Sequence, residues 1–125
     1  MGVRGLQIST RETGDVTILD LRGRATIGCE CELLRSRLKD LVAHGVRKLL
    51  LNLADVNQVD SYGLGVIAET SESLRGQGGS LKFLRPNSRV LTVLQVTHVL
   101  EIIPSFDDEA KALASFQARG YAATP

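Results

Sequence analysis

One serine stands where its hydroxyl group could be chemically important. Ser61 follows Asp60 and opens a stretch in which apolar residues recur at helical spacing. The apolar run 49–53 and the turn-like segment 54–58 precede it, so the pattern predicts a strand, a short loop and a helix. Unpaired N–H groups and the helix dipole favour negative charge at a helix start. Ser61 is therefore either a simple capping residue or a phosphorylation site, and the two uses are compatible.

The same segment is a poor match to known catalytic patterns. A nucleophile elbow needs glycine where Val59 stands, and its general base would have to be His44 or His98. The stretch 63–68 formally matches a dinucleotide fingerprint, but its glycines lie inside the predicted helix and no acidic residue follows at the required distance. The cysteines and histidines lack the spacing of zinc ligands. The sequence predicts no enzyme activity, no cofactor and no metal, so that Ser61 is a substrate and not a catalyst.

Two glycines, Gly63 and Gly65, fall in the first turns of this predicted helix. Each costs about 1 kcal/mol of helix stability relative to alanine. Close approach of the helix to the sheet, or of a partner protein to the helix, would explain such a cost. The sequence does not decide which glycine serves which purpose.

Composition limits the remaining possibilities. The 125 residues fit one domain, and 15 basic and 14 acidic residues give a net charge of +1. This balance, with only five aromatic residues, argues against a nucleic-acid surface. No apolar run approaches the ~18–20 residues that span a bilayer, and no signal peptide is evident. We expect a cytoplasmic protein in which Cys29 and Cys31 are reduced thiols.

Apolar patterning predicts five strands and four helices in the order ββαβαβαβα. The strands are expected at 6–10, 16–21, 48–53, 80–84 and 102–103, with a hairpin turn at 13–15. The helices are expected over 33–42, 61–77, 88–97 with Ser88 as its cap, and from Ser105 or Asp107 onward. Residues 118–125 are expected to form a frayed tail. The fold class is a single α/β domain, 1–125, with a mixed, mostly parallel sheet and an antiparallel N-terminal strand.

Residues 52–53 followed by 59–66 resemble the Asp-Ser-x-Gly-Leu-Gly phosphorylation segment of the STAS family, specifically of bacterial anti-sigma factor antagonists. The resemblance covers nearly the whole domain. Supporting matches are Leu21-Arg22-Gly23, 78–81, 90–94 with Thr97, and 102–106.

The resemblance implies a partner-switching regulator. In that family the unmodified protein binds an anti-sigma factor that is also an ATP- and magnesium-dependent serine kinase, and phosphorylation ends the complex until a serine phosphatase reverses it. Carried over, Ser61 is the phosphate acceptor, and a weak homodimer is a further expected partner state. The other expected partner-binding residues in this segment are Asp60, Tyr62, Gly63, Leu64 and Gly65.

The chain also departs from the family pattern. Arg22 and Arg24 make a basic loop after the second strand. Arg24 and Thr26 stand where members often carry an acidic residue and then an aspartate. This loop is expected at the same sheet end as Ser61, either as a solvated loop or as a further partner contact. Tyr62 is bulky where small residues are frequent, so partner choice is expected to differ. The main alternative is a STAS docking subunit of a membrane lipid-transport complex, with Ser61 unphosphorylated.

Overall fold

The structure is a computed structural model that describes residues 5–25 and 29–122, without the side chains of residues 29, 30 and 118–122. Its strands are β1 (Leu6–Thr13), β2 (Val16–Ala25), β3 (Lys48–Val59), β4 (Ser80–Leu84) and β5 (Ser105–Phe106). Its helices are α1 (Cys29–Ala43), α2 (Ser61–Gly76), α3 (Ser88–Val96), the short 3₁₀ helix η1 (Val99–Glu101) and α4 (Glu109–Ala122).

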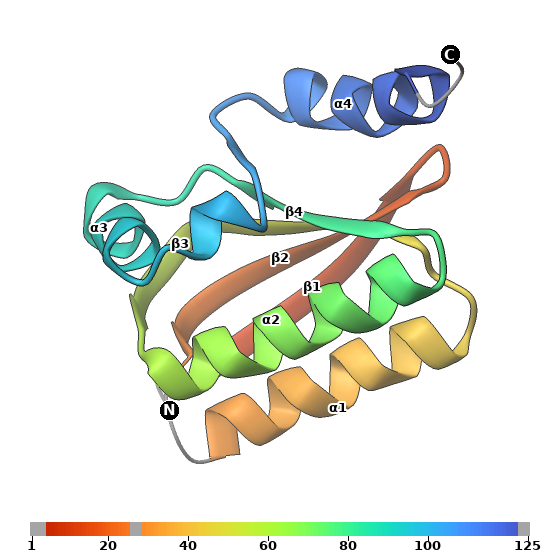
Figure 1. Ribbon diagram of the computed structural model, residues 1–125. Coiled ribbons are helices and arrows are strands. Elements are labelled where there is room, and N and C mark those ends of the chain that lie inside the picture. The colour runs from red at the N-terminus through yellow and green to blue at the C-terminus, as the bar shows by residue number, and fades with distance from the viewer. Residues whose placement is uncertain (1–4, 26–28, 123–125) are drawn as a thin grey trace.

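The five strands form one sheet in the order β1-β2-β3-β4-β5, in which β1 is antiparallel to β2 and every other neighbour is parallel. Helices α1 and α2 lie against one face of the sheet and α4 lies against the other (Figure 1). This arrangement confirms the predicted α/β class and the antiparallel N-terminal hairpin. It also places the start of α2 beside the end of β2.

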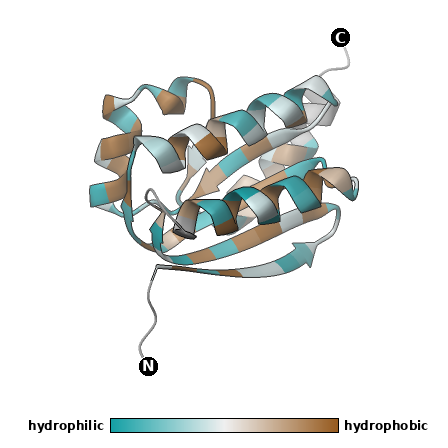
Figure 2. Ribbon diagram, turned by 90° about the horizontal axis from the view of Figure 1, so that it is seen from below, coloured by the Kyte–Doolittle hydropathy of each residue, from teal (hydrophilic) through white to brown (hydrophobic). Residues whose placement is uncertain are grey.

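Two apolar clusters hold these layers together. The larger lies between the sheet and α1 and α2, and it includes the fully buried Leu38, Leu51 and Leu74. The smaller lies under α4, where Ala112 and Phe116 pack on residues of β2, β3 and β4. Seen from below in Figure 2, α1 and α2 run side by side across the sheet with hydrophilic and hydrophobic residues alternating along them.

The prediction of a turn at 54–58 is wrong. Strand β3 continues to Val59 because β2 extends as far as Ala25 and pairs with it, in the register Arg22 with Asp55 and Ala25 with Val59. The chain therefore passes from strand to helix through Asp60 alone, without a loop. For the same reason Arg22 and Arg24 lie in a strand, and the basic loop that was expected is not formed.

Gly23 explains part of this longer strand. Its φ of 111° is a conformation that favours glycine, and a side-chain carbon there would lie 2.0 Å from the carbonyl oxygen of Gly5. The register of β2 against β3 shifts on either side of it. The Leu21-Arg22-Gly23 element is therefore a structural one, because Gly23 lets Gly5 lie close beside β2, where the Gly5 carbonyl oxygen accepts the Arg24 N–H at 2.9 Å.

The last elements differ from the prediction in their positions. Residues 102–103 follow η1 and are not a strand, since the strand that pairs with β4 is Ser105–Phe106. The apolar character of Ile103 reflects its burial in the larger cluster. Helix α3 is capped by Asn87 and not by Ser88, because the Asn87 side chain accepts a hydrogen bond from the Val90 N–H at 3.0 Å.

Helix α4 begins at Glu109, later than Ser105 or Asp107, and the Asp108 carboxylate accepts the Lys111 N–H at 3.0 Å. The helix continues to Ala122, so the first five residues of the expected tail are helical, and residues 123–125 lie outside the described part. In α1, Cys31 is buried, whereas the side chain of Cys29 lies outside the described ones.

Candidate functional site

Asp60 fixes the start of α2. Its side chain accepts a hydrogen bond from the Gly63 N–H at 3.0 Å, and its extended backbone is typical of an N-cap residue. Its own N–H donates to the carbonyl oxygen of Ala25, at the end of β2, at 3.3 Å. Asp60 therefore ties the helix start to the sheet as well as capping it.

Ser61 is the first residue of α2 and is exposed. No hydrogen bond of its side chain occurs within the described part of the chain, because Asp60 has taken the capping role. The hydroxyl therefore lies at the positive end of the helix dipole, accessible from solvent and not required for the local fold.

The two glycines have different surroundings. A side-chain carbon on Gly63 would lie 2.3 Å from the carbonyl oxygen of Ala25, whereas one on Gly65 would meet nothing within 4 Å. Gly63 and Leu64 are buried and face the sheet, and Leu64 is only 6% exposed. Of the expected partner-binding residues in this helix, Ser61, Tyr62 and Gly65 are the exposed ones.

Tyr62 belongs to a polar cluster between α1 and α2 that the sequence did not reveal. Its hydroxyl donates to the Glu32 carboxylate at 3.0 Å and accepts from Arg35 at 3.5 Å. Arg35 also forms an ion pair with Glu69 at 2.8 Å and lies over the Tyr62 ring. The partners are about thirty residues apart in sequence, so no local pattern could have indicated them. The cluster holds the ring of Tyr62, which is 37% exposed, beside Ser61.

Arg22 and Arg24 lie near the end of β2 and line a shallow hollow of about 590 Å³ with Asp55 and Asn57 of β3. Arg22 and Asp55 form an exposed ion pair at 3.9 Å. A pair this exposed contributes little to stability. The expectation that these arginines lie near the sheet end that carries Ser61 is confirmed, because Ala25 directly contacts the start of α2.

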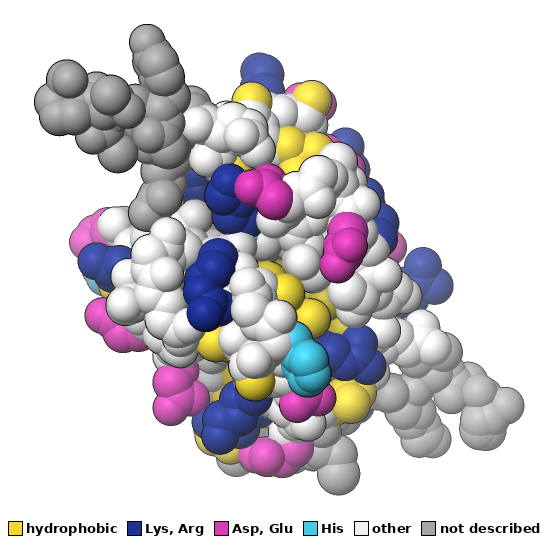
Figure 3. All heavy atoms as spheres, turned by 90° about the vertical axis from the view of Figure 1, so that its right-hand side faces the viewer, with side chains coloured by type: hydrophobic (Ala, Val, Ile, Leu, Met, Phe, Trp, Pro, Cys, Tyr) yellow, Lys and Arg dark blue, Asp and Glu magenta, His cyan; other side chains and the backbone are white. Residues whose placement is uncertain are grey.

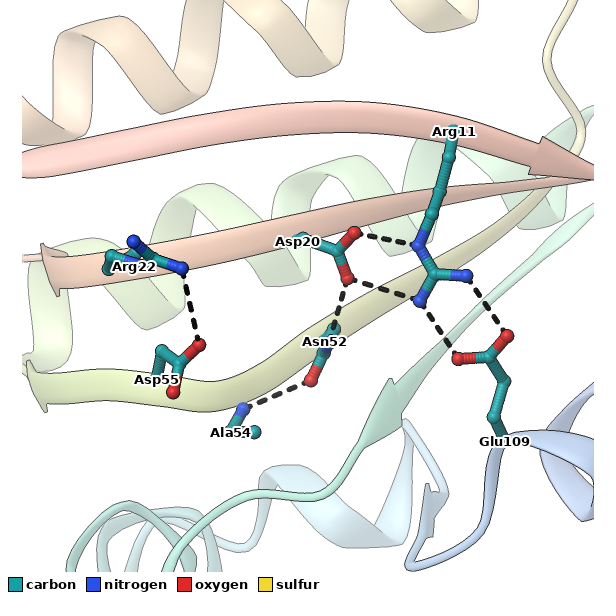
Figure 4. Close-up of polar contacts among 7 residues, drawn as sticks. All are labelled: Arg11, Asp20, Arg22, Asn52, Ala54, Asp55 and Glu109. Carbon is teal, nitrogen blue, oxygen red and sulfur yellow. Dashed lines mark hydrogen bonds and ion pairs between the residues drawn. The ribbon is translucent and has the colours of Figure 1, made fainter.

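A second polar cluster joins α4 to the face of the sheet that α1 and α2 do not cover (Figure 4). Arg11 of β1 bonds both Asp20 of β2, at 2.7 Å, and Glu109 of α4, at 2.8 Å. Asn52 of β3 donates to the same Asp20 carboxylate at 2.7 Å. The hydrogen bonds from Arg11 are the main cause that lowers the pKa of both carboxyl groups below their ordinary values. This cluster fixes a helix and offers no reacting group.

The two histidines have local partners. His44 Nδ1 lies 2.7 Å from the Asp40 carbonyl oxygen, and His98 Nδ1 lies 3.0 Å from the Glu101 carboxylate. Neither imidazole is hydrogen-bonded to Ser61 within the described residues. The same residues contain no group of three or more His, Cys, Asp or Glu side chains placed to hold a metal ion.

Charge on the surface is mixed. On the end of the molecule opposite the α2 N-terminus, basic and acidic side chains are interspersed (Figure 3).

Among the helices that the structure describes, none combines the length and apolar character that a bilayer crossing requires.

Known proteins are similar to this chain in sequence and in fold. A Thermotoga neapolitana protein named as a TM1081 homolog and anti-sigma factor antagonist is 39% identical over 75 residues, which are 60% of this chain and 66% of that protein. The anti-sigma-B factor antagonist of Bacillus subtilis is 37% identical over 71 residues, 57% of this chain and 64% of that protein. The matched stretches thus span just under two thirds of these curated relatives.

Solved structures agree over more of the chain. A crystal structure of an anti-sigma factor antagonist from Thermotoga maritima superposes with a TM-score of 0.83 at 28% identity, covering 88% of this chain and 94% of that one. The anti-sigma factor antagonist SpoIIAA in its unphosphorylated form, at 18% identity and a TM-score of 0.67, shares the fold over 91% of this chain and 99% of its own. The STAS domain family matches residues 7–112. This chain belongs to the STAS domain family.

Proposed function

We propose that this protein is an anti-sigma factor antagonist controlled at Ser61. With Ser61 unmodified it binds an anti-sigma factor that is also a serine kinase, and phosphorylation of Ser61 releases it. A serine phosphatase restores the binding form, and the cycle runs in the cytoplasm without direct contact to nucleic acid. The relatives named as anti-sigma factor antagonists support this proposal.

The observation that carries the proposal is the division of roles between two adjacent residues. Asp60 caps α2, so the neighbouring Ser61 hydroxyl is exposed and has no hydrogen bond within the described residues. A kinase can therefore transfer the γ-phosphoryl group of ATP to Ser61 Oγ without breaking the helix cap. SpoIIAA, which shares the fold, has also been solved in a phosphorylated form.

The charge of the phosphate provides the switch. Phosphoserine carries about −1.5 to −2 charges at neutral pH. The N-terminus of α2 accommodates that charge within the free protein, so the fold is expected to change little. In a complex, burying the same dianion without a partner costs several kcal/mol, and each 1.4 kcal/mol is a tenfold loss of affinity. Phosphorylation would thus end the complex without a large conformational change.

The partner contacts of the proposed site surround Ser61. Tyr62 and Gly65 share the exposed side of α2 with it, and Arg22 and Arg24, near the end of β2, are further contacts in the proposal. Gly63 and Leu64 act indirectly, by holding the helix on the sheet. The ring of Tyr62 would make this surface selective for a partner that can accept an aromatic residue next to the phosphate acceptor.

Ser88 offers a matched control for the charge test. It is the first residue of α3 and follows the capping residue Asn87, as Ser61 follows Asp60. Ser61→Asp should abolish kinase binding, whereas Ser61→Ala and Ser88→Asp should retain it, with native circular dichroism in all three. Equal binding by Ser61→Asp and Ser61→Ala would contradict the charge switch.

Identification of the partner needs the native protein. Purification from its own cells, followed by mass spectrometry, should recover an ATP-binding serine kinase together with a fraction of the protein phosphorylated on Ser61. Recovery of a transporter ATPase with unmodified Ser61 would instead support a docking subunit of a lipid-transport complex and would reject the proposal.

A further inference from the structure

A groove of about 440 Å³ is lined by residues of α1 and α2. The apolar residues that reach its surface are Val42 and Ala43 of α1, and the buried Leu38 and Val66 lie beneath them. A volume of this size is within the range of small-molecule sites in proteins, roughly 300–1,000 Å³. Nothing in the proposed switch at Ser61 uses this groove.

The polar groups around the groove define its charge. Arg35 and Glu69 form an ion pair at 2.8 Å that crosses from α1 to α2, so each neutralises the other. Lys39 is the third charged residue of the lining, and the described structure records no ion pair for it. It is exposed, so its ammonium group is available to a ligand whose apolar part lies on the groove floor.

The Arg35–Glu69 ion pair also limits what the groove can accept. A partner helix anchors through apolar residues spread over two or more turns and therefore needs a continuous open surface. Here such a helix would have to displace the pair that bridges α1 and α2. A short flexible chain does not have this requirement.

We propose that this groove binds a medium-chain fatty-acid anion, with its carboxylate at Lys39 and its hydrocarbon chain against Val42 and Ala43. The proposal is independent of phosphorylation at Ser61. It rests on the apolar lining and on Lys39, the one basic residue of the lining that forms no ion pair with the described residues. A carboxylate with an apolar chain complements both features.

Decanoate, kept below the concentration at which it forms micelles, is the probe. Titration of the full-length protein, followed by NMR of the methyl groups, should shift the signals of Leu38, Val42 and Val66 in a saturable way. Decyltrimethylammonium has the same chain with the opposite charge and should produce weaker shifts at these groups. Equal shifts with the two amphiphiles would reject the role of Lys39.

Three variants separate the site from general surface effects. Lys39→Glu should weaken decanoate binding roughly fivefold, the size expected for one exposed charge pair. Lys111→Glu, on α4 at the opposite face of the sheet, makes the same charge change and should leave binding unchanged. Ser73→Leu, at an exposed position of the lining, should fill the groove and abolish binding. Methyl signals that stay unshifted in the native protein, or equal affinity in both lysine variants, would overturn the proposal.

Discussion

The first turn of α2 has a side that packs on the sheet and a side that faces solvent. On the buried side, Gly63 lies so close to the Ala25 carbonyl oxygen that no side chain fits, and Leu64 packs against the sheet. On the exposed side, Ser61, Tyr62 and Gly65 leave the helix surface open to solvent. The two glycines of this short motif therefore have different roles. Gly63 is required by the fold, whereas Gly65 leaves the helix surface accessible.

The same division separates Asp60 from Ser61. Asp60 makes the cap and contacts β2, whereas the Ser61 side chain makes no hydrogen bond within the described structure. A regulatory residue can change its charge safely only if the fold does not depend on it. The adjacent structural residues make that independence possible.

Gly63→Ala tests the buried side most severely. The added methyl group would lie 2.3 Å from a backbone oxygen that cannot move without disturbing β2. We expect a loss of about 3 kcal/mol in the free energy of unfolding, measured by urea denaturation, as for severe overpacking. A variant as stable as the native protein would show that the helix start is not fixed on the sheet.

Asp60→Ala removes the cap and should cost about 1 kcal/mol in the free energy of unfolding. Asp60→Asn keeps an acceptor for the Gly63 N–H and should recover most of that loss, which makes it the matched control. If Ser61→Ala proves as destabilising as Asp60→Ala, the assignment of the cap to Asp60 alone is wrong.

Gly65→Ala should change stability in the opposite direction to Gly63→Ala. The methyl group meets no atom within 4 Å, so the variant should be more stable by about 1 kcal/mol through its higher helix propensity. If a partner approaches α2 at this point, the same variant should bind the kinase more weakly despite its greater stability. Stability and affinity that rise together would show that Gly65 is not a contact.

Lowering the pH should have the smallest effect on stability. It acts on the face of the sheet that α4 covers, where polar contacts hold this helix. The folded-state pKa values of Asp20 and Glu109 lie below the ordinary values of 3.8 and 4.5 because Arg11 bonds both. Their contribution is therefore fully present above those values and is lost as pH falls through the lowered ones.

These side chains are partly exposed, so the loss should stay below about 1 kcal/mol. Unfolding measured between neutral pH and pH 3 should show it in the native protein, and Arg11→Gln should reduce the pH dependence. An identical pH profile in both proteins would mean that the cluster in Figure 4 does not hold α4 in solution.

Local signals in the sequence predicted much of the fold. The helix that starts at residues 60–61, the strand 80–84 and the N-terminal hairpin follow from apolar spacing and turn residues, and the structure confirms them. The errors lie where distant pairing decides the conformation. Polar residues 54–58 extend a strand because β2 lies beside them, and the apolar residues 102–103 fill a core without joining the sheet.

The candidate site divides in the same way. The sequence by itself determined that Ser61 lies at a helix start, and from that position it predicted a phosphorylation site, because capping and dipole effects are local. Only the tertiary structure decided that Gly63 is fixed by Ala25, that Gly65 is open, and that Tyr62 is bonded to α1. Those outcomes depend on contacts between residues far apart in the chain, and composition and periodicity carry no record of such contacts.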